Sequence, residues 1–431
     1  MQYFNCRILS LLIMIIAPVI VASDWPQFLG PQANGMSKET GILKDWNTKA
    51  PKEVWTLRVG EGYSAPSVAG DRLFMFDREG DQARLRCLDR RTGKEIWTTS
   101  YPTSYEDMYQ FSNGPRAAPL IEGDRVYIHG VDGMLRCQKT SDGSIIWEMD
   151  TNKKYGVVQN FFGVGSSPVI YGDKLIVMVG GSPADSPKIR TGNTKGNGSG
   201  IVAFDKKTGK ELYKFSDEMA SYATPIIAKI NGRDYGLAFA RGGLLGFDPK
   251  SSAKDFHFPW RARKIESVNA ATPVVIGDQI FITESYEYGG ALLKVKNKEV
   301  EVVWKDPPRR GQSMASHWAT PIHRNGYLYG CHGESAGNAE LRSLELATGK
   351  VLWSKPGLKR TSLLYADGHL LVLGEGGDLT LVEANPKQYV EKGQLKKLVN
   401  SPAWNAPVLS KGLLYVRGGD KLVCLELIPP A

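Results

Sequence analysis

The chain has 431 residues, including 47 Gly and 24 Pro, and 42% of its residues are hydrophobic and 10% aromatic. This composition is typical of many short strands joined by tight turns, and it argues against a protein built of long helices. The formal net charge is +9 without a lysine-rich tract, so we expect no nucleic-acid partner.

The N-terminus has the three parts of an export signal. Arg7 supplies a positive charge, residues 8–21 form an apolar run, and "VAS" at 21–23 offers small residues for cleavage. The run is shorter than the roughly 20 residues of a membrane-spanning helix. We therefore predict a signal peptide over 1–23, no transmembrane segment in the mature chain, and a periplasmic or secreted protein. A retained anchor is the alternative. Residues 24–49 then form a lead segment.

A repeat fills residues 50–431. Its first marker is a small residue, usually followed by Pro, and then two apolar runs separated by a turn. This pattern is typical of a β-hairpin, because Gly-Asp and Asn-Gly turns join antiparallel strands. The marker occurs eight times, at 64–76, 117–129, 166–178, 223–239, 271–283, 319–331, 361–373 and 405–417.

The second marker is an eleven-residue phrase, "CLDRRTGKEIW" at 87–97, with close copies at 203–213 and 343–353. Its first residue is small, its seventh is Gly and its eleventh is aromatic. Gly permits the positive φ that the turn requires, and the large ring can pack against a neighbouring sheet where a small side chain leaves room. The phrase predicts a second hairpin, and four strands per repeat describe the blade of a β-propeller.

The last repeat contains only three strands. Residues 50–60, "APKEVWTLRVG", carry the missing strand, in which Trp55 takes the place that Trp97 has in the first repeat. Closing the ring with strands from both ends of the chain removes open sheet edges. We predict an all-β fold, an eight-bladed β-propeller with four-stranded antiparallel blades, in which an N-terminal strand completes the last blade.

Four cysteines follow the predicted signal peptide, and we expect them to be free. Cys87, Cys137 and Cys424 stand at equivalent positions of the repeat, and Cys331 is the fourth. Equivalent atoms of neighbouring sheets lie about 10 Å apart, which is beyond the reach of a disulfide. We therefore expect buried thiols that pack as small apolar side chains.

The phrase at 87–97, the eightfold count and "DWPQFLGPQANGMS" at 24–37 together resemble the pyrroloquinoline-quinone-type propeller repeat family. The resemblance covers nearly all of residues 24–431 and implies the eight-bladed fold. The family includes quinoprotein dehydrogenases, which hold the quinone and calcium in the central funnel, and the barrel-assembly scaffold lipoprotein of the bacterial outer membrane. The dehydrogenases resemble one another in an adjacent Cys-Cys pair, and this chain has neither that pair nor a Cys-x-x-Cys-His haem signature.

Loops that enter the innermost strands should gather on one face, around a central funnel where ligands commonly bind. Three segments enlarge this face, at 101–116, 152–165 and 180–200. Their aromatic side chains, interleaved with Arg and Asn, can stack on sugars or aromatic ligands, or can simply roof the funnel. The residues that precede the inner strands are our candidate ligand-binding residues: Tyr63, Arg116, Tyr222, Asn269, Trp318, Arg360 and Trp404.

One cluster is a candidate metal site. We expect His317 to begin the first strand of the sixth blade and His332 to lie almost opposite it, with Cys331 and Glu334 nearby. Two imidazoles and a carboxylate can ligate zinc. Alternate residues of a strand face opposite ways, so Cys331 should point away from His332. The sequence favours two unrelated surface histidines over a metal site, so no metal is predicted.

Three functional hypotheses remain open. The leading one is a non-catalytic, monomeric scaffold, without a cofactor, that engages a protein or polysaccharide partner through its loop-bearing face. The alternative implied by the family is an oxidoreductase that uses pyrroloquinoline quinone and calcium. A carbohydrate-active enzyme that uses the central funnel is the third. The sequence identifies no catalytic residue, because no nucleophile elbow and no paired acid and base stand out.

Overall fold

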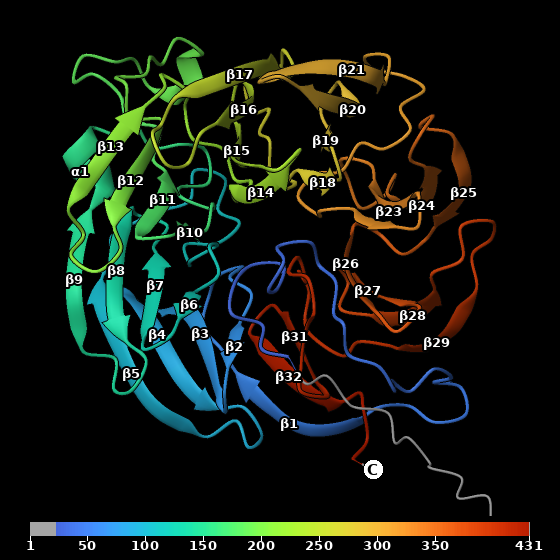
Figure 1. Cartoon of the computed structure of the whole chain (residues 1–431). Helices are drawn as coiled ribbons and strands as arrows, with labels where there is room; N and C mark the ends of the chain where they lie inside the picture. Colours follow the sequence, from blue (N-terminus) through green and yellow to red (C-terminus); the bar gives the residue numbers. More distant parts are fainter. Residues whose placement is uncertain (1–22, 431) are drawn as a thin grey trace, which may run out of the picture.

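A computed structural model describes residues 23–430, in which eight four-stranded antiparallel sheets surround a central axis (Figure 1). The predicted eight-bladed propeller is therefore confirmed. The predicted signal peptide lies, apart from Ser23, outside the described residues. Within residues 23–430, no helix has the length and apolar character needed to cross a membrane.

In each of the first four blades the strands follow one another in chain order, from the innermost to the outermost. Blade one is β2 (Ser67–Ala69), β3 (Arg72–Glu79), β4 (Gln82–Asp89) and β5 (Glu95–Pro102). Blade two is β6 (Leu120–Glu122), β7 (Arg125–His129), β8 (Met134–Lys139) and β9 (Ile145–Asp150). Blade three is β10 (Val169–Tyr171), β11 (Lys174–Met178), β12 (Ile201–Asp205) and β13 (Glu211–Phe215). Blade four is β14 (Ile226–Ile230), β15 (Arg233–Ala240), β16 (Gly243–Phe247) and β17 (Lys254–Pro259).

The other four blades also run from the innermost to the outermost strand. Blade five is β18 (Val274–Ile276), β19 (Gln279–Glu284), β20 (Gly289–Lys296) and β21 (Glu299–Lys305). Blade six is β22 (Ile322–Arg324), β23 (Tyr327–His332), β24 (Glu340–Glu345) and β25 (Val351–Pro356). Blade seven is β26 (Thr361–Ala366), β27 (His369–Gly374), β28 (Leu379–Glu383) and β29 (Glu391–Leu395). Blade eight is β30 (Val408–Ser410), β31 (Leu413–Gly418), β32 (Lys421–Glu426) and β1 (Lys52–Arg58). The helices of the described chain are α1 (Thr151–Tyr155) and the 3₁₀ turn η1 (Ile189–Thr191).

The two ends of the chain close the ring, as predicted. Strand β1 pairs antiparallel with β32, and Trp55 stands opposite Cys424. The Trp55 Nε1 then donates to the carbonyl oxygen of Arg90 in blade one, at 3.1 Å. The strand from the N-terminal side thus completes blade eight and also joins it to blade one.

Tryptophans of the outer strands join neighbouring blades. Trp97 stands opposite Cys87 within blade one, and its Nε1 donates to the Thr140 carbonyl oxygen of blade two at 3.1 Å. A Cβ on Gly143, where φ is +76°, would lie 2.7 Å from the Trp97 ring. Gly at the seventh position of the phrase therefore has two roles: it allows the positive φ of the turn, and it leaves room for the indole ring of the preceding blade. Equivalent indole-to-carbonyl bonds are Trp147 to Lys206, Trp304 to Leu346 and Trp353 to Asn385.

Blade seven lacks an aromatic residue in its outer strand, and the lead segment supplies one. Gly393 occupies the position of the missing aromatic residue, opposite Leu381. Trp46 covers it, since a Cβ on Gly393 would lie 2.6 Å from the Trp46 Cβ. The Trp46 amide donates to the Lys392 carbonyl oxygen at 2.8 Å, and the side chain is buried in the core that blades seven and eight share.

The lead segment, 24–49, lies on the face opposite the loops that enter the inner strands. Its Asp24 accepts a hydrogen bond from the Gly70 amide, in the first hairpin turn of blade one. Its Gly41 amide donates to Asp367, in the equivalent turn of blade seven, at 2.9 Å. The blue segment in Figure 1 reaches the centre of the ring. It therefore covers one end of the central channel.

All four cysteines of the described chain are buried and free, as expected: Cys87, Cys137, Cys331 and Cys424. Three of them lie inside β-sheets at the position opposite an outer-strand tryptophan. Burial raises the pKa of the Cys87 thiol to about 12, and that of Cys424 likewise to about 12. These thiols therefore stay protonated and act as packing groups.

Candidate functional site

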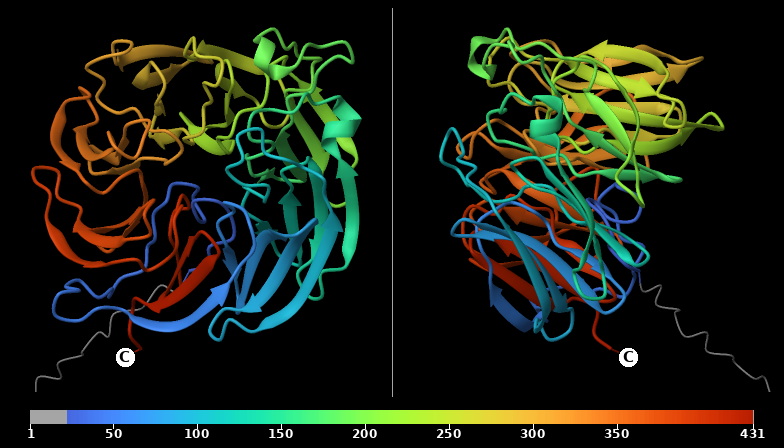
Figure 2. Two further views of the ribbon diagram at one scale, coloured as in Figure 1. Left: turned by 180° about the vertical axis from the view of Figure 1, so that it is seen from behind. Right: turned by 90° about the vertical axis from the view of Figure 1, so that its left-hand side faces the viewer.

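The three predicted insertions lie on one side of the ring. In the side view of Figure 2, the loops around 101–116 and 180–200, drawn in cyan and green, project to the left. The insertions also touch one another. The Gln159 amide group donates to the Glu106 carbonyl oxygen at 3.0 Å, and the Arg190 guanidinium lies 5.6 Å from the centre of the Tyr109 ring. This loop-bearing face surrounds the mouth of the central channel.

A cavity of about 200 Å³ occupies the channel. The structure places six of the seven candidate residues in its lining: Tyr63, Arg116, Tyr222, Trp318, Arg360 and Trp404. Asn269 lies elsewhere. It is fully buried, and its side-chain amide donates to the carbonyl oxygens of Ala240 and Trp260, at 2.8 and 3.0 Å. Its side chain ties down the connection between blades four and five, so it does not face the channel.

Stacked aromatic rings form the wall of the cavity. The ring centres of Tyr63 and Trp404 lie 4.5 Å apart, those of Trp404 and Trp318 4.9 Å, and those of Trp318 and His317 5.0 Å. Such tilted contacts are the geometry that aromatic pairs prefer. Phe28, from the lead segment, also lines the cavity. The cavity is therefore an aromatic-walled chamber whose floor comes from outside the repeat.

Two arginines bring charge to this chamber. The Arg360 guanidinium lies 4.5 Å from the centre of the Trp318 ring and forms an ion pair with Glu375. Arg116 lies 5.7 Å from the Tyr63 ring centre and pairs with Asp107. Each cation is thus neutralised by a carboxylate and held against an aromatic ring. Burial raises the pKa of Tyr63 to about 12, so its hydroxyl stays protonated.

His317 belongs to this chamber and does not begin a strand. The prediction that it opens blade six is wrong, because β22 begins only at Ile322 and the preceding loop carries the Trp318 ring into the cavity. Its Nε2 lies 2.9 Å from the Tyr286 hydroxyl. Burial, followed by the charges of Arg360 and Lys264, lowers the pKa of His317 to about 3, so the imidazole is neutral at physiological pH.

The other candidate metal ligands have partners of their own. His332 Nδ1 accepts a hydrogen bond from the Ala315 amide at 3.1 Å, and burial lowers its pKa to about 4. Glu334 forms an ion pair with Lys264 at 2.8 Å. Cys331 is buried and accepts from the Thr361 amide. Over residues 23–430 no three His, Cys, Asp or Glu side chains are grouped so that they could hold one metal ion.

A chamber that binds a quinone together with calcium must supply oxygen ligands to the calcium ion. Calcium takes six to eight oxygen ligands, with carboxylates prominent among them. The lining residues of the described chain supply hydroxyl and amide oxygens, as from Thr320 and Asn405, and no carboxylate side chain. The aromatic walls suit a planar ring, whereas the oxygen donors do not fit the calcium ion.

Two parts of this chamber could not be found by sequence reasoning. Phe28 and Leu29 form part of its lining, yet they lie in a segment without strand periodicity. The only sequence signal was an aromatic pair, Trp25 and Phe28, next to Pro and Gly in a polar stretch. The sequence pattern around His317 predicts a strand, which places His317 only as a metal ligand and not in the chamber wall.

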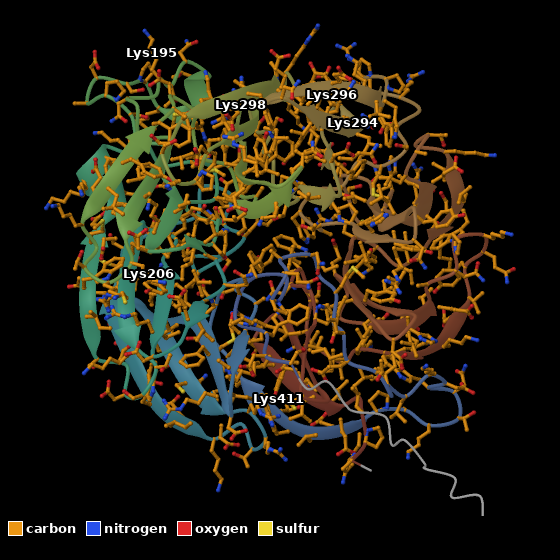
Figure 3. All side chains as sticks on the ribbon, viewed as in Figure 1. Lys195, Lys206, Lys294, Lys296, Lys298 and Lys411 are labelled. Carbon is orange, nitrogen blue, oxygen red and sulfur yellow. The ribbon has the colours of Figure 1, made fainter. Side chains whose placement is uncertain are left out.

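Figure 3 labels six lysines. Three of them, Lys294, Lys296 and Lys298, belong to blade five, and the other three lie on other blades or loops. Five of them have an acidic partner: Lys206 with Glu122, Lys294 with Asp278, Lys296 with Glu301, Lys298 with Asp255 and Lys411 with Asp24. The labelled lysines therefore do not form one continuous basic surface.

Comparison with known proteins gives the family. The family model described as "Outer membrane protein assembly factor BamB" matches residues 39–200 and 81–355, which together span well over half of the chain. The outer membrane protein assembly factor BamB of Burkholderia pseudomallei is 21% identical over 391 residues, which cover 86% of each chain.

Solved structures share the fold. The crystal structure of BamB from Moraxella catarrhalis superposes with a TM-score of 0.61 at 13% identity, covering 87% of this chain and 99% of that one. The quinohemoprotein alcohol dehydrogenase of Comamonas testosteroni gives a TM-score of 0.51 at 13% identity, covering 95% of this chain and 81% of that one. At these identities the likeness establishes the eight-bladed fold alone.

Proposed function

The chain belongs to the family described as outer membrane protein assembly factor BamB, and from that premise we propose that it is a non-catalytic scaffold that assists the assembly of outer membrane proteins. On this proposal it acts in the periplasm, and a protein partner binds its loop-bearing face. The chamber's aromatic and neutralised character supports binding more than catalysis. Within residues 23–430 its lining contains no carboxylate side chain, and the His317 imidazole contacts Tyr286 and Arg360 rather than a lining serine or threonine.

One observation carries this proposal. Tyr109, Phe111 and Phe162 form an aromatic collar at the mouth of the chamber, and Phe111 is 55% exposed. The Phe111 ring centre lies 5.8 Å from that of Trp404, so the collar continues into the chamber wall. Exposed aromatic rings that adjoin a pocket are typical of protein-binding surfaces, where such residues supply much of the binding energy.

A cellular experiment tests the proposal. Deletion of the gene should lower the amount of folded outer membrane proteins, and Phe111→Ser should reproduce part of this loss at an unchanged level of the chain. Ile145→Ser is the matched control, since Ile145 is 48% exposed on the outer strand of blade two, away from the collar. Normal outer membrane proteins in the deletion strain would contradict the proposal.

A partial sequence match to a quinoprotein dehydrogenase raises a second candidate, an oxidoreductase that uses pyrroloquinoline quinone. The stacked walls of Trp318 and Trp404 suit a planar quinone, whereas the absence of lining carboxylates among the described residues weighs against calcium. Titration with the quinone, with and without calcium, separates the candidates. A spectral shift together with thermal stabilisation would favour the oxidoreductase, because a ligand of the native state must stabilise it.

A further inference from the structure

A second cavity lies on the same face, between blades two and three. Its volume is about 600 Å³, within the range of ligand-binding pockets. The segment after β5, the turn between β7 and β8, and the connection that follows α1 form its walls. It shares no lining residue with the aromatic chamber. The two cavities are therefore separate sites.

Three of the side chains that line this pocket are acidic and form no ion pair in the described chain. Glu106, Asp132 and Asp150 line it, whereas no Lys, Arg or His of the described chain does. None of the three carboxylates forms an ion pair within residues 23–430, in contrast to Asp107 beside the chamber, which pairs with Arg116. In a chain of net charge +9, an uncompensated cluster of three carboxylates attracts a cation.

Two of these carboxylates keep an oxygen free. Asp132 uses Oδ1 to accept from the Tyr101 hydroxyl and the Met134 amide, at 3.1 and 3.2 Å. Asp150 uses Oδ1 to cap α1, accepting from the Lys153 amide at 2.8 Å. The second oxygen of each accepts no hydrogen bond from the described residues. Both carboxylates can therefore receive a donor from a ligand without losing their structural bonds.

Buried polar atoms in the same pocket also lack partners. The hydroxyl of Tyr105, whose side chain is 7% exposed, and that of Ser166, at 2%, form no hydrogen bond within the described chain. The side-chain oxygen of Asn152 likewise has no donor. All three residues line the pocket. Buried polar groups are nearly always paired, so their common location indicates that a donor-bearing ligand completes the site.

We propose that this pocket binds an organic cation with several N–H donors, a guanidinium or ammonium group. Such a group matches the free carboxylate oxygens through charge-assisted hydrogen bonds and supplies donors to the unpaired acceptors. On a scaffold the natural source is an Arg or Lys side chain of the bound protein, and this assignment of the source rests on the proposed function. The binding of the cation itself is independent of that function.

Calorimetric titration of the purified protein with Nα-acetyl-argininamide tests the proposal, with Nα-acetyl-citrullinamide as the neutral isostere. The arginine compound should bind, more weakly as salt is added, and the citrulline compound should bind at least about tenfold more weakly. Spermidine is a second cation. If spermidine binds more strongly than the arginine compound, free polyamines are the source of the bound cation. If the arginine compound binds more strongly, the source is a protein side chain. Equal binding of the citrulline compound, or heat from neither cation, would overturn the proposal.

A variant locates the binding. Asp132→Asn keeps the Oδ1 acceptor for Tyr101 and Met134 and removes the charge, and it should weaken binding of the arginine compound about tenfold. Asp185→Asn makes the same charge change in the 180–200 insertion, outside the pocket, and should leave affinity unchanged. An equal effect of the two variants would contradict a site at this pocket. Because the probes are small molecules, a negative result here leaves the cellular test of the scaffold unaffected.

Discussion

Trp46 packs against Gly393 and takes the place that outer-strand tryptophans hold in other blades. The lead segment thereby supplies to blade seven the indole that its own sequence lacks. The Leu43 amide of the same segment donates to Leu427, just after β32 of blade eight, at 3.0 Å. The segment therefore joins blades seven and eight, and this part of the ring depends on residues far away in the sequence.

The first prediction concerns this contact. Trp46→Ala should lower the free energy of unfolding by about 3 kcal/mol, as expected for the loss of a buried aromatic side chain. Trp97→Ala, at the equivalent place between blades one and two, should cost a similar amount. Chemical denaturation monitored by circular dichroism measures both. Phe111→Ala is the control, and it should have little effect, since its ring is exposed. No loss from Trp46→Ala would contradict the role of the lead segment.

The second prediction concerns ring closure. Trp55 and Cys424 are directly opposite across β1 and β32, so Trp55→Cys should form a disulfide with Cys424 under mild oxidation. Mass spectrometry of non-reduced peptides detects the cross-link. Thr56→Cys is the control, because Thr56 stands opposite Val423 and its side chain points to the other face of the sheet. A disulfide between Cys424 and the Thr56→Cys variant, and none with Trp55→Cys, would contradict the register of β1 against β32.

The third prediction is a dependence of stability on pH. The pKa of His317 is about 3 in the folded chain, below its usual value of 6.5, so the unfolded chain binds the proton more readily. The contribution of the neutral imidazole to the free energy of unfolding is complete above pH 6.5 and is lost as the pH falls towards 3. At pH 5 the loss is about 2 kcal/mol. His317→Gln should reduce the slope of the free energy of unfolding against pH between pH 6.5 and 5, as measured by urea denaturation. An unchanged slope in His317→Gln would contradict the assignment.

The fourth prediction concerns Arg360 and Glu375, an ion pair of which both side chains are largely buried. Arg360→Met should destabilise the fold by about 3 kcal/mol, because it leaves the Glu375 charge unpaired. Adding Glu375→Gln should restore part of the loss, and a double-mutant cycle measures the coupling. The exposed pair Lys296–Glu301 is the control and should contribute less than about 1 kcal/mol. If the stability losses of the two single variants add up to the loss of the double variant, Arg360 and Glu375 are not coupled.

The repeat made the fold predictable from the sequence. Its markers combine the period of two in the strands with Gly at turns, and they fix both the number of blades and the pairing of Trp55 with Cys424. The position of most chamber residues followed from the same topology, because the residue before each inner strand must lie near the axis. Ligand binding by these residues stays a prediction.

Other parts of the site depended on contacts that no local pattern encodes. Asn269 has the right place in the repeat, yet two carbonyl oxygens hold its side chain away from the channel. His317 lies in a loop whose apolar residues imitate a strand. The lead segment carries no periodicity, so neither Phe28 in the chamber nor Trp46 on Gly393 could be placed from sequence.

The acidic pocket was also invisible in the sequence. Glu106 and Asp132 come from two separate connections and Asp150 from the end of β9, and each alone is indistinguishable from a solvated surface charge. Only the packing of blades two and three brings them together with the unpaired Tyr105 and Ser166 hydroxyls.

The proposed scaffold function is tested most directly by photo-crosslinking in living cells. A photoreactive benzoyl-phenylalanine at the position of Phe111, in the aromatic collar, should give one dominant covalent adduct with a component of outer membrane protein assembly. The same group at the position of Ile145, exposed on the outer strand of blade two, should not. Identical adducts from both positions, or an adduct from Ile145 alone, would contradict a partner on the loop-bearing face.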